Sequence, residues 1–355
     1  MEKEITIYDI ARELSISPTT VSRGLNNHPA VNKNTKQKIF DAAAQMGYRS
    51  NAFASRLRKQ RTNTLGVIVP RLDSNFQSLV MAGMEKVANE AGYNLIISQS
   101  LETAQKEIAN ARTMFENRVD GLLVSLAYDT ENIDHFEPFF SKGIPLLFYD
   151  RVPENKQCTS IVINNIQAAH TATTHLVEQG CQRIVHISGN LRINVYKDRL
   201  KGYKYALMDH NIAFRENYVI ETNLSEQAGV EAANKILQMD PLPDGIFVAN
   251  DTCAVSCIKT LKQAGISIPG DIAVVGFNND PITRIIEPNL TSVDYPGGEM
   301  GEVAVRSLIN YLDGVSDVSI TNTITLRSEL VVRESSLKKK LTAPPAKSGK
   351  AAGMV

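Results

Sequence analysis

The fold is decided first by residues 6–48, which read TIYDIARELSISPTTVSRGLNNHPAVNKNTKQKIFDAAAQMGY. Apolar side chains recur at helical spacing from Ile7 to Leu14, which predicts a short amphipathic helix. Ser17 followed by Pro18 combines an N-cap with a first-turn proline, so a second helix is expected to begin there. Two short helices separated by a tight turn form a helix-turn-helix.

A third helix completes a small bundle. Asn32 is its predicted N-cap and Gly47 its predicted end, because glycine is the usual residue just past a helix C-terminus. The side chains expected to face inward are Ile39, Ala42, Ala43 and Met46.

A helix-turn-helix reads DNA with the first part of its second helix, which enters the major groove. That places the side chains of Pro18, Thr19, Ser22 and Arg23 near base edges or phosphates. Arg23 is the best candidate base reader, since a guanidinium can donate two hydrogen bonds to guanine, worth roughly 1–3 kcal/mol of discrimination. The alternative is a three-helix packing module without a nucleic-acid role.

The charge of the chain is segregated, although its 38 basic and 38 acidic residues give a net charge of zero. Residues 1–62 hold eleven Lys and Arg against five Asp and Glu, a net charge of +6, and the rest of the chain therefore carries −6. A basic head on an acidic body is typical of a polyanion-binding module fused to another domain, although a solvated surface gives the same count.

The length and composition narrow the class of protein. A chain of 355 residues predicts two or three domains. Hydrophobic content of 43%, no apolar run near the roughly 18 residues of a membrane span and no secretory signal predict a cytoplasmic protein without a membrane partner. The scattered cysteines, for which no redox or metal role is expected, are Cys158, Cys181, Cys253 and Cys257.

From Thr64 onward, short apolar runs alternate with helical patterns, which predicts parallel sheets covered by helices on both faces. The expected strands are residues 65–69, 94–98, 121–125 and 145–149, then 160–163, 183–188, 245–249 and 272–277. Because the pattern restarts halfway, we expect two similar lobes with a ligand cleft at the carboxyl ends of their strands.

These features resemble the lac repressor (LacI) family of bacterial transcription regulators. Residues 6–70 carry the resemblance, with the family's T-V-S-R core at 20–23 and its G-Y pair at 47–48. It extends nearly to Val332, through VDGLLVS, RLKGY, AND and PNLTSVDYP. It implies a small all-α helix-turn-helix domain plus a hinge helix, followed by an α/β two-lobed effector domain of the periplasmic-binding-protein-like (type I) fold.

The resemblance also implies domain boundaries: 1–49 for the helix-turn-helix, 50–62 for the hinge helix or linker, and 63–337 for a two-lobed domain that binds effector and dimerises. Crossings between lobes are expected near Ile163, Thr291 and Thr323. The expected lobes are about 63–162 and 292–323 for the first, and about 163–291 and 324–337 for the second. The Lys-, Pro- and Ala-rich tail, 338–355, is expected to be disordered.

Carried over by position, the resemblance assigns DNA contacts. Bases would be faced by Pro18, Thr19 and Arg23, and phosphates by Thr6, Ser17, Thr20, Ser22, Asn26 and Tyr48. In the hinge, Asn51 would also contact DNA, and Leu57 would be the wedge that enters the minor groove. Ser50 and Ser55 depart from the family pattern, and a plain linker remains the alternative.

The resemblance implies an effector site made of Asp73, Phe76, Gln77, Arg199, Leu224, Asn250 and Asn278. A sugar or sugar derivative is the expected ligand, and Arg199 could fork onto two hydroxyls or a carboxylate. Gln77, Leu224 and Asn278 depart from common family residues, so a non-sugar ligand or a vestigial pocket stays open.

The sequence therefore predicts a DNA-binding transcription regulator, most simply a repressor, that acts as a homodimer on a palindromic operator under control of a small effector. A solute-binding receptor would share the body but lack the DNA-binding head. No P-loop, H-E-x-x-H or nucleophile elbow occurs, so no catalytic residues, metal or cofactor are expected. The helices predicted at 76–91 and 301–312 could belong to the core or to a dimer surface.

Overall fold

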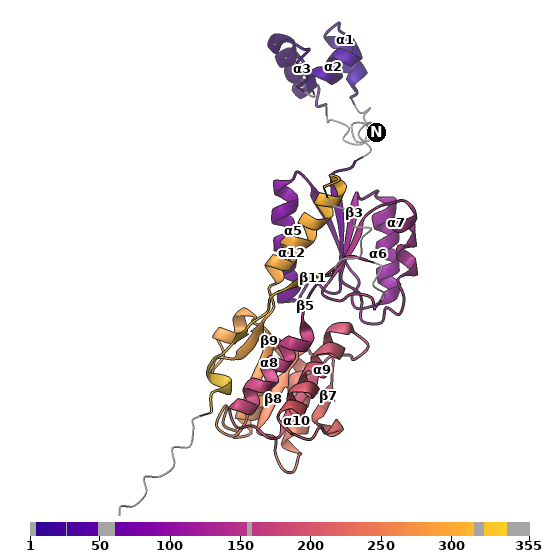
Figure 1. Ribbon diagram of the computed structural model, residues 1–355. Coiled ribbons are helices and arrows are strands. Elements are labelled where there is room, and N and C mark those ends of the chain that lie inside the picture. The colour runs from indigo at the N-terminus through magenta and orange to yellow at the C-terminus, as the bar shows by residue number, and fades with distance from the viewer. Residues whose placement is uncertain (1–4, 26, 49–60, 155–157, 316–322, 339–355) are drawn as a thin grey trace, which may run out of the picture. The chain divides into compact units, whose positions relative to one another are not determined.

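The computed structural model describes residues 5–25, 27–48, 61–154, 158–315 and 323–338 (Figure 1). The chain divides into two compact units, residues 1–62 and residues 63–355. They are called the head and the body below.

The head contains α1 (Ile7–Glu13), α2 (Pro18–Leu25) and α3 (Lys33–Gln45). Both predicted caps are confirmed: the Ser17 hydroxyl accepts from the Thr20 amide at 3.1 Å, and the Asn32 side chain accepts from the Thr35 amide at 2.8 Å. Gly47 follows α3 at φ +69°, past the helix end as predicted. The three helices meet at Ile10, Val21 and Ile39, which are fully buried.

The body contains two six-stranded sheets. In the first sheet all strands are parallel, in the order β11-β5-β4-β3-β1-β2. Its strands are β1 (Thr64–Val69), β2 (Asn94–Gln99), β3 (Gly121–Val124), β4 (Leu146–Tyr149), β5 (Ser160–Ile163) and β11 (Thr323–Leu326). Their apolar side chains face helices on both sides, which explains why the central strands are buried along their whole length.

The second sheet has the order β12-β10-β9-β8-β6-β7, and only β12 runs antiparallel to its neighbour. Its strands are β6 (Ile184–Ser188), β7 (Val219–Glu221), β8 (Gly245–Val248), β9 (Ala273–Asn278), β10 (Thr291–Asp294) and β12 (Leu330–Val331). The two sheets define two lobes, as the alternation of apolar runs predicts.

Helices cover both faces of each sheet (Figure 1). In the first lobe α5 (Asn75–Glu90) packs with α12 (Gly297–Leu312) on one face, and α6 (Ala104–Glu116) and α7 (Glu137–Ser141) pack on the other. In the second lobe, α8 (Asn165–Glu178) packs with α9 (Asn194–Asp209), and α10 (Glu226–Leu237) packs with α11 (Asp251–Gln263). This is the predicted α/β fold class.

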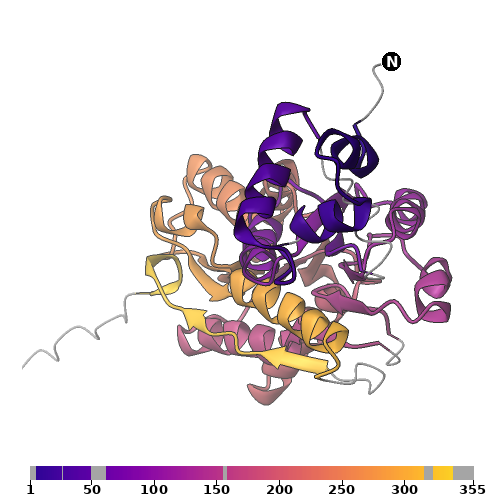
Figure 2. The ribbon, with the colours of Figure 1, turned by 90° about the horizontal axis from the view of Figure 1, so that it is seen from above.

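The lobes are discontinuous in sequence, and the lobe boundaries expected from the sequence need correction. Because β10 pairs with β9 in the second sheet, the second crossing follows Asp294 rather than Thr291. Because β11 pairs with β5 in the first sheet, the third crossing follows Leu326 rather than Thr323. In Figure 1 the orange helix α12 (Gly297–Leu312) lies beside the early helix α5 (Asn75–Glu90), and Figure 2 shows the orange helix and the yellow strands of this late segment from above. Pairing partners far away in sequence decide which sheet a four-residue strand joins, and apolar runs do not encode them.

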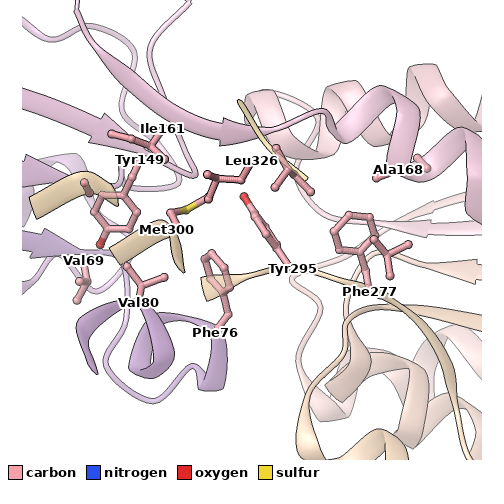
Figure 3. Close-up of a cluster of buried hydrophobic side chains, with 14 of the residues drawn as sticks. Val69, Phe76, Val80, Tyr149, Ile161, Ala168, Phe277, Tyr295, Met300 and Leu326 are labelled. Atoms are coloured by element: carbon pink, nitrogen blue, oxygen red, sulfur yellow. The ribbon is translucent and has the colours of Figure 1, made fainter. Parts of the chain in front are cut away.

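The lobes share one hydrophobic core at the crossing (Figure 3). Phe76 at the start of α5 stacks on Tyr295, with ring centroids 4.3 Å apart, and Tyr295 meets Phe277 of β9 edge-on at 6.0 Å. Burial of each such ring contributes about 1.5–3 kcal/mol. Apolar packing therefore continues from the first lobe into the second.

The described ranges contain no membrane-spanning helix, no metal-binding group of side chains and no disulfide. No described helix is long and apolar enough to cross a bilayer. No group of three His, Cys, Asp or Glu side chains in those ranges is placed to hold a metal ion. The four cysteines are free and buried, and burial raises the pKa of the Cys181 thiol to about 11 and that of Cys253 to about 12.

Candidate functional site

The head exposes a polar face on α2. Val21 and Gly24 point into the head core, whereas the side chains of Thr19 and Arg23 are exposed on the other side of the helix. Pro18 and Ser22 are half-buried beside them. A helix start with an exposed hydroxyl and an exposed guanidinium can dock in a major groove and reach base edges.

Three of the expected phosphate contacts also build the head. The Thr6 amide and hydroxyl donate to Asp9 at 2.9 and 2.7 Å, which caps α1. The Ser17 and Thr20 hydroxyls lie 2.8 Å apart at the start of α2. These groups lie at helix N-termini, where amides and the helix dipole favour an anion.

Of the other residues expected to contact DNA, the structure describes some and not others. Tyr48 is half-buried and packs against the head core. Asn26, Asn51 and Leu57 lie outside the described residues, as do the departures at Ser50 and Ser55.

The body encloses a cavity of about 590 Å³ at the carboxyl ends of the strands of both sheets. All seven residues expected to bind effector line it: Asp73, Phe76, Gln77, Arg199, Leu224, Asn250 and Asn278. Parallel strands explain this convergence, because loops that follow strands of one sheet meet at the same edge.

Arg199 of α9 is the most buried cation that lines the cavity, with 3% of its surface exposed. Its Nε donates to the Asn165 side chain at 2.9 Å and its Nη1 donates to the Ala249 carbonyl at 2.7 Å. The guanidinium carbon lies 3.5 Å from the centroid of the Phe277 ring. Burial lowers the pKa of Arg199, but an arginine keeps its charge in a protein. A fixed, charged donor thus faces the cavity.

Gln77 belongs to a buried network rather than to an open surface. Its amide nitrogen lies 3.4 Å from a carboxylate oxygen of Asp150, and the Tyr149 hydroxyl donates to its oxygen at 3.1 Å. The Tyr295 hydroxyl donates to the other Asp150 oxygen at 2.7 Å. Burial raises the pKa of Asp150, whereas Arg151 and the Tyr295 hydrogen bond lower it. The network ties the first lobe to the crossing segment.

Two cavity residues of the second lobe adopt left-handed backbone conformations. Leu224 is buried at φ +57°, and Asn278 ends β9 at φ +112°. The Asn250 side chain donates to the Leu224 carbonyl at 3.1 Å and accepts from the Cys253 amide at 2.9 Å, so it holds this turn while it caps α11. Such conformations cost about 1–3 kcal/mol each and cluster at functional sites.

Asp73 lies at the rim. It pairs with Arg71 at 2.5 Å, and both side chains are more than half exposed. The Arg71 hydrogen bond lowers the pKa of Asp73. This carboxylate is therefore ionised and already partnered.

Sequence reasoning missed part of the cavity wall. The missed residues include Glu102, Tyr128, Asp150, Arg151, Tyr196, Glu226, Asp280 and Tyr295. Asp150 and Tyr295 directly follow strands, and Asp280 comes two residues after β9, so position at the carboxyl end of a parallel strand is a signal that could have selected them. Tyr128 and Tyr196 come from a loop and a helix start without such a signal.

Hydrogen bonds bridge the lobes on both sides of the cavity. On one side the Asn75 amide donates to Asp280 at 2.7 Å. On the other, Asn194 accepts from the Val152 amide at 3.2 Å, and Lys197 pairs with Glu154 at 2.6 Å. The structure thus holds the lobes together around the cavity.

Comparison with known proteins agrees with both units. Residues 6–51 match the family model described as bacterial regulatory proteins, lacI family. Residues 173–336 match the model of a periplasmic binding protein-like domain. A solved structure described as the transcriptional regulator CelR–cellobiose complex superposes with a TM-score of 0.70 at 26% identity, covering 94% of this chain and all of that one.

Two curated relatives extend over nearly the whole chain. Catabolite control protein A of Priestia megaterium is 34% identical over 310 residues, which is 87% of this chain and 93% of the relative. The HTH-type transcriptional repressor PurR of Photobacterium profundum is 31% identical over 332 residues, 93% of this chain and 98% of the relative. These relatives are transcription regulators rather than enzymes. By its head, its two-lobed body and these matches, the chain belongs to the LacI family of bacterial DNA-binding transcription regulators.

Proposed function

We propose that this protein is a repressor that reads a palindromic operator as a homodimer, and that a sugar-like molecule in the cavity changes its grip on DNA. The observation that carries the effector half is Arg199, a buried guanidinium that faces the cavity. Among the described residues, no carboxylate lies within ion-pair distance of it, and its hydrogen bonds go to an amide and a carbonyl. Its remaining N–H groups are available to a ligand.

Recognition of the operator rests on α2. Thr19 and Arg23 read bases, and the helix N-termini at Thr6 and Ser17 take phosphates, with Thr20, Ser22, Asn26 and Tyr48. Leu57 is proposed as the minor-groove wedge, together with Asn51 in the hinge. The exposure of Thr19 and Arg23 on one face of α2 supports the base-reading part.

A dimer follows from the two-fold symmetry of such operators. The apolar face of α12 packs into the core of the first lobe, where Met300, Val305 and Leu308 are fully buried. Exposed apolar side chains of this lobe include Ile96 and Ile97 on the edge strand β2 and Leu79 on α5, which lie on neighbouring elements. We assign the dimer surface of the first lobe to β2 and α5.

The cavity suits a neutral polyol. Two of its arginines, Arg71 and Arg151, already pair with Asp73 and Glu102, and the wall also carries Asp150, Glu226 and Asp280, so acidic residues outnumber the arginines and do not favour a phosphate. Amides, carboxylates and Arg199 can serve hydroxyls, and aromatic rings can cover the apolar face of a sugar. The similar CelR structure contains a sugar, cellobiose, which supports the same class here.

Effector binding and DNA binding are coupled in this proposal by a shift in population between an open and a closed body. A ligand that contacts Phe76 and Gln77 of one lobe and Arg199 and Asn250 of the other binds the closed body better than an open one. It therefore shifts the equilibrium by its difference in affinity for the two states, and DNA affinity changes by the same coupling free energy.

The test is selection of bound sequences from a random DNA pool by the purified protein, without and with a mixture of neutral sugars. We expect an enriched palindrome whose recovery changes when sugars are added. Replacing Arg23 by Ala should relax preference at one base step by roughly 1–3 kcal/mol and leave binding to random DNA nearly intact. Enrichment of the same palindrome regardless of any sugar would refute sugar control, and no enrichment would refute sequence-specific reading.

A further inference from the structure

A second polar and aromatic cluster lies in the cavity, apart from the residues assigned above. Arg151 Nη1 lies 2.6 Å from Glu102 Oε2, with the two side chains 13% and 24% exposed. The Arg151 guanidinium carbon lies 5.9 Å from the centroid of the Tyr196 ring. Tyr128 also lines this part of the wall. The four residues are called the outer cluster below.

The chain adopts unfavourable backbone conformations to present this cluster. Leu101 and Glu102 are consecutive non-glycine residues in the left-handed region, at φ +51° and +63°, and Asp150, directly before Arg151, lies at +57°. Each such residue costs about 1–3 kcal/mol unless its surroundings impose the conformation. A Cβ atom on Gly189 would lie 2.6 Å from the Tyr196 ring, so a glycine there makes room for the ring.

Tyr128 is electrostatically close to the rest of the outer cluster. Burial raises the pKa of its hydroxyl, the negative charge of Glu221 raises it further, and Arg151 lowers it. Tyr128 comes from the loop after β3 in the first lobe, whereas Tyr196 comes from α9 in the second. The outer cluster is therefore assembled from both lobes.

Tyr196 connects the outer cluster to Arg199. Its ring centroid lies 5.9 Å from the Arg151 guanidinium carbon and 5.6 Å from that of Arg199. The cavity thus places two guanidinium groups near one aromatic ring. Arg199 is backed by Phe277 at 3.5 Å, and Arg151 is neutralised by Glu102.

We propose that the effector consists of two linked sugar units, one held at Arg199 and the second held by the outer cluster. This inference rests on the proposed sugar effector and adds its size and its second contact surface. Aromatic rings offer their faces to the apolar face of a sugar ring, while the Arg151–Glu102 pair offers both donors and acceptors to hydroxyls. Because that pair has no net charge, the second unit is neutral.

The experiment is calorimetric titration of the full-length protein with neutral monosaccharides and with disaccharides built from them, including glucose with cellobiose and maltose, and galactose with lactose. We expect one disaccharide to bind at least ten-fold more tightly than its constituent monosaccharides. Tyr128→Ala and Glu102→Gln should each remove that advantage and leave the Kd of the monosaccharide within about two-fold. Tyr205→Ala, which removes an exposed tyrosine not in the cavity lining, is the matched control and should change neither.

The outcomes separate this inference from the proposed function. Every variant is first checked for an unchanged urea-unfolding transition of the body and for unchanged binding to the selected operator, which together show that both units fold. Monosaccharides that bind as tightly as disaccharides would overturn the second unit while the sugar effector stands. A disaccharide advantage that survives both Tyr128→Ala and Glu102→Gln would also overturn the outer cluster as its site. Binding of no sugar by a protein that still binds its operator would overturn the proposed effector class and this inference with it.

Discussion

The head and the body hold the side chains proposed to bind DNA and effector by different means. In the head, Thr19 and Arg23 lie on a short helix whose position depends on one small core and on hydrogen bonds to residues a few positions away. In the body, Arg199 is held by groups 34 and 50 residues away, at Asn165 and Ala249. Local interactions therefore hold the proposed DNA-reading face, whereas long-range packing holds the cavity. Single changes should separate the two activities.

The largest separation of operator binding from effector binding is expected from a change in the head core. Ile39→Ala deletes a fully buried side chain and should cost about 2–5 kcal/mol. A bundle with so small a core cannot absorb that loss, so operator binding should disappear while effector binding persists. Gel-shift and calorimetric titrations of the same preparation measure both. Loss of effector binding in parallel would contradict independent support of the two units.

Acid should weaken the body before the head, through His186. Burial lowers the pKa of this fully buried imidazole to about 4, and its Nε2 has no hydrogen-bond partner within the described part of the chain. The unfolded chain takes up the proton near pH 6.5 but the folded body does not, so the stability present above pH 6.5 falls as pH drops towards 4. The difference corresponds to about 3 kcal/mol.

Urea unfolding of the full-length protein at pH 7 and pH 5 measures the effect of His186. The matched variant His186→Phe keeps a ring stacked on Phe247, whose centroid lies 4.7 Å from that of His186. It should flatten the pH dependence of the body transition. An unchanged slope in this variant would assign the acid sensitivity to other groups, such as His175, whose pKa burial also lowers.

A smaller effect is expected where two helices of the body meet. Gly301 of α12 packs against the backbone of α5, and a Cβ atom there would overlap the Val80 carbonyl. Gly301→Ala should therefore destabilise the body by about 1–3 kcal/mol and leave the head unaffected. Gly298→Ala is the control on the same helix, because no atom lies within 4 Å of the place that its Cβ would occupy. Equal melting temperatures of the two variants would argue against close α5–α12 packing.

The smallest change concerns the cap of α2. Ser17→Ala removes the acceptor of the Thr20 amide and should cost the head about 1 kcal/mol. Ser17→Asp restores a capping oxygen but adds a negative charge beside the proposed phosphate contact. Stability should then recover in thermal unfolding while operator affinity does not. Recovery of both would remove Ser17 from the phosphate contacts.

Many of the residues that line the cavity could be predicted from the sequence, but the contacts among their side chains could not. Position after a parallel strand correctly places Asn250 and Asn278 at the cavity, and the same rule could have found Asp150 and Tyr295. It does not reveal that the Gln77 side chain is hydrogen-bonded to Asp150 and Tyr149, or that two guanidinium groups lie within 6 Å of the Tyr196 ring centroid. Those contacts join residues that are remote in sequence.

By itself, the sequence determined the three helices of the head, their caps and the α/β class of the body. These depend on periodicity and on hydrogen bonds to neighbours three or four residues away, so they are visible in the order of the residues. Only the tertiary structure decided which lobe receives β10 and β11, and what partners Arg199 and Arg151 have. Strand pairing and buried polar contacts depend on which distant segments pack against one another. A local sequence pattern therefore cannot predict them.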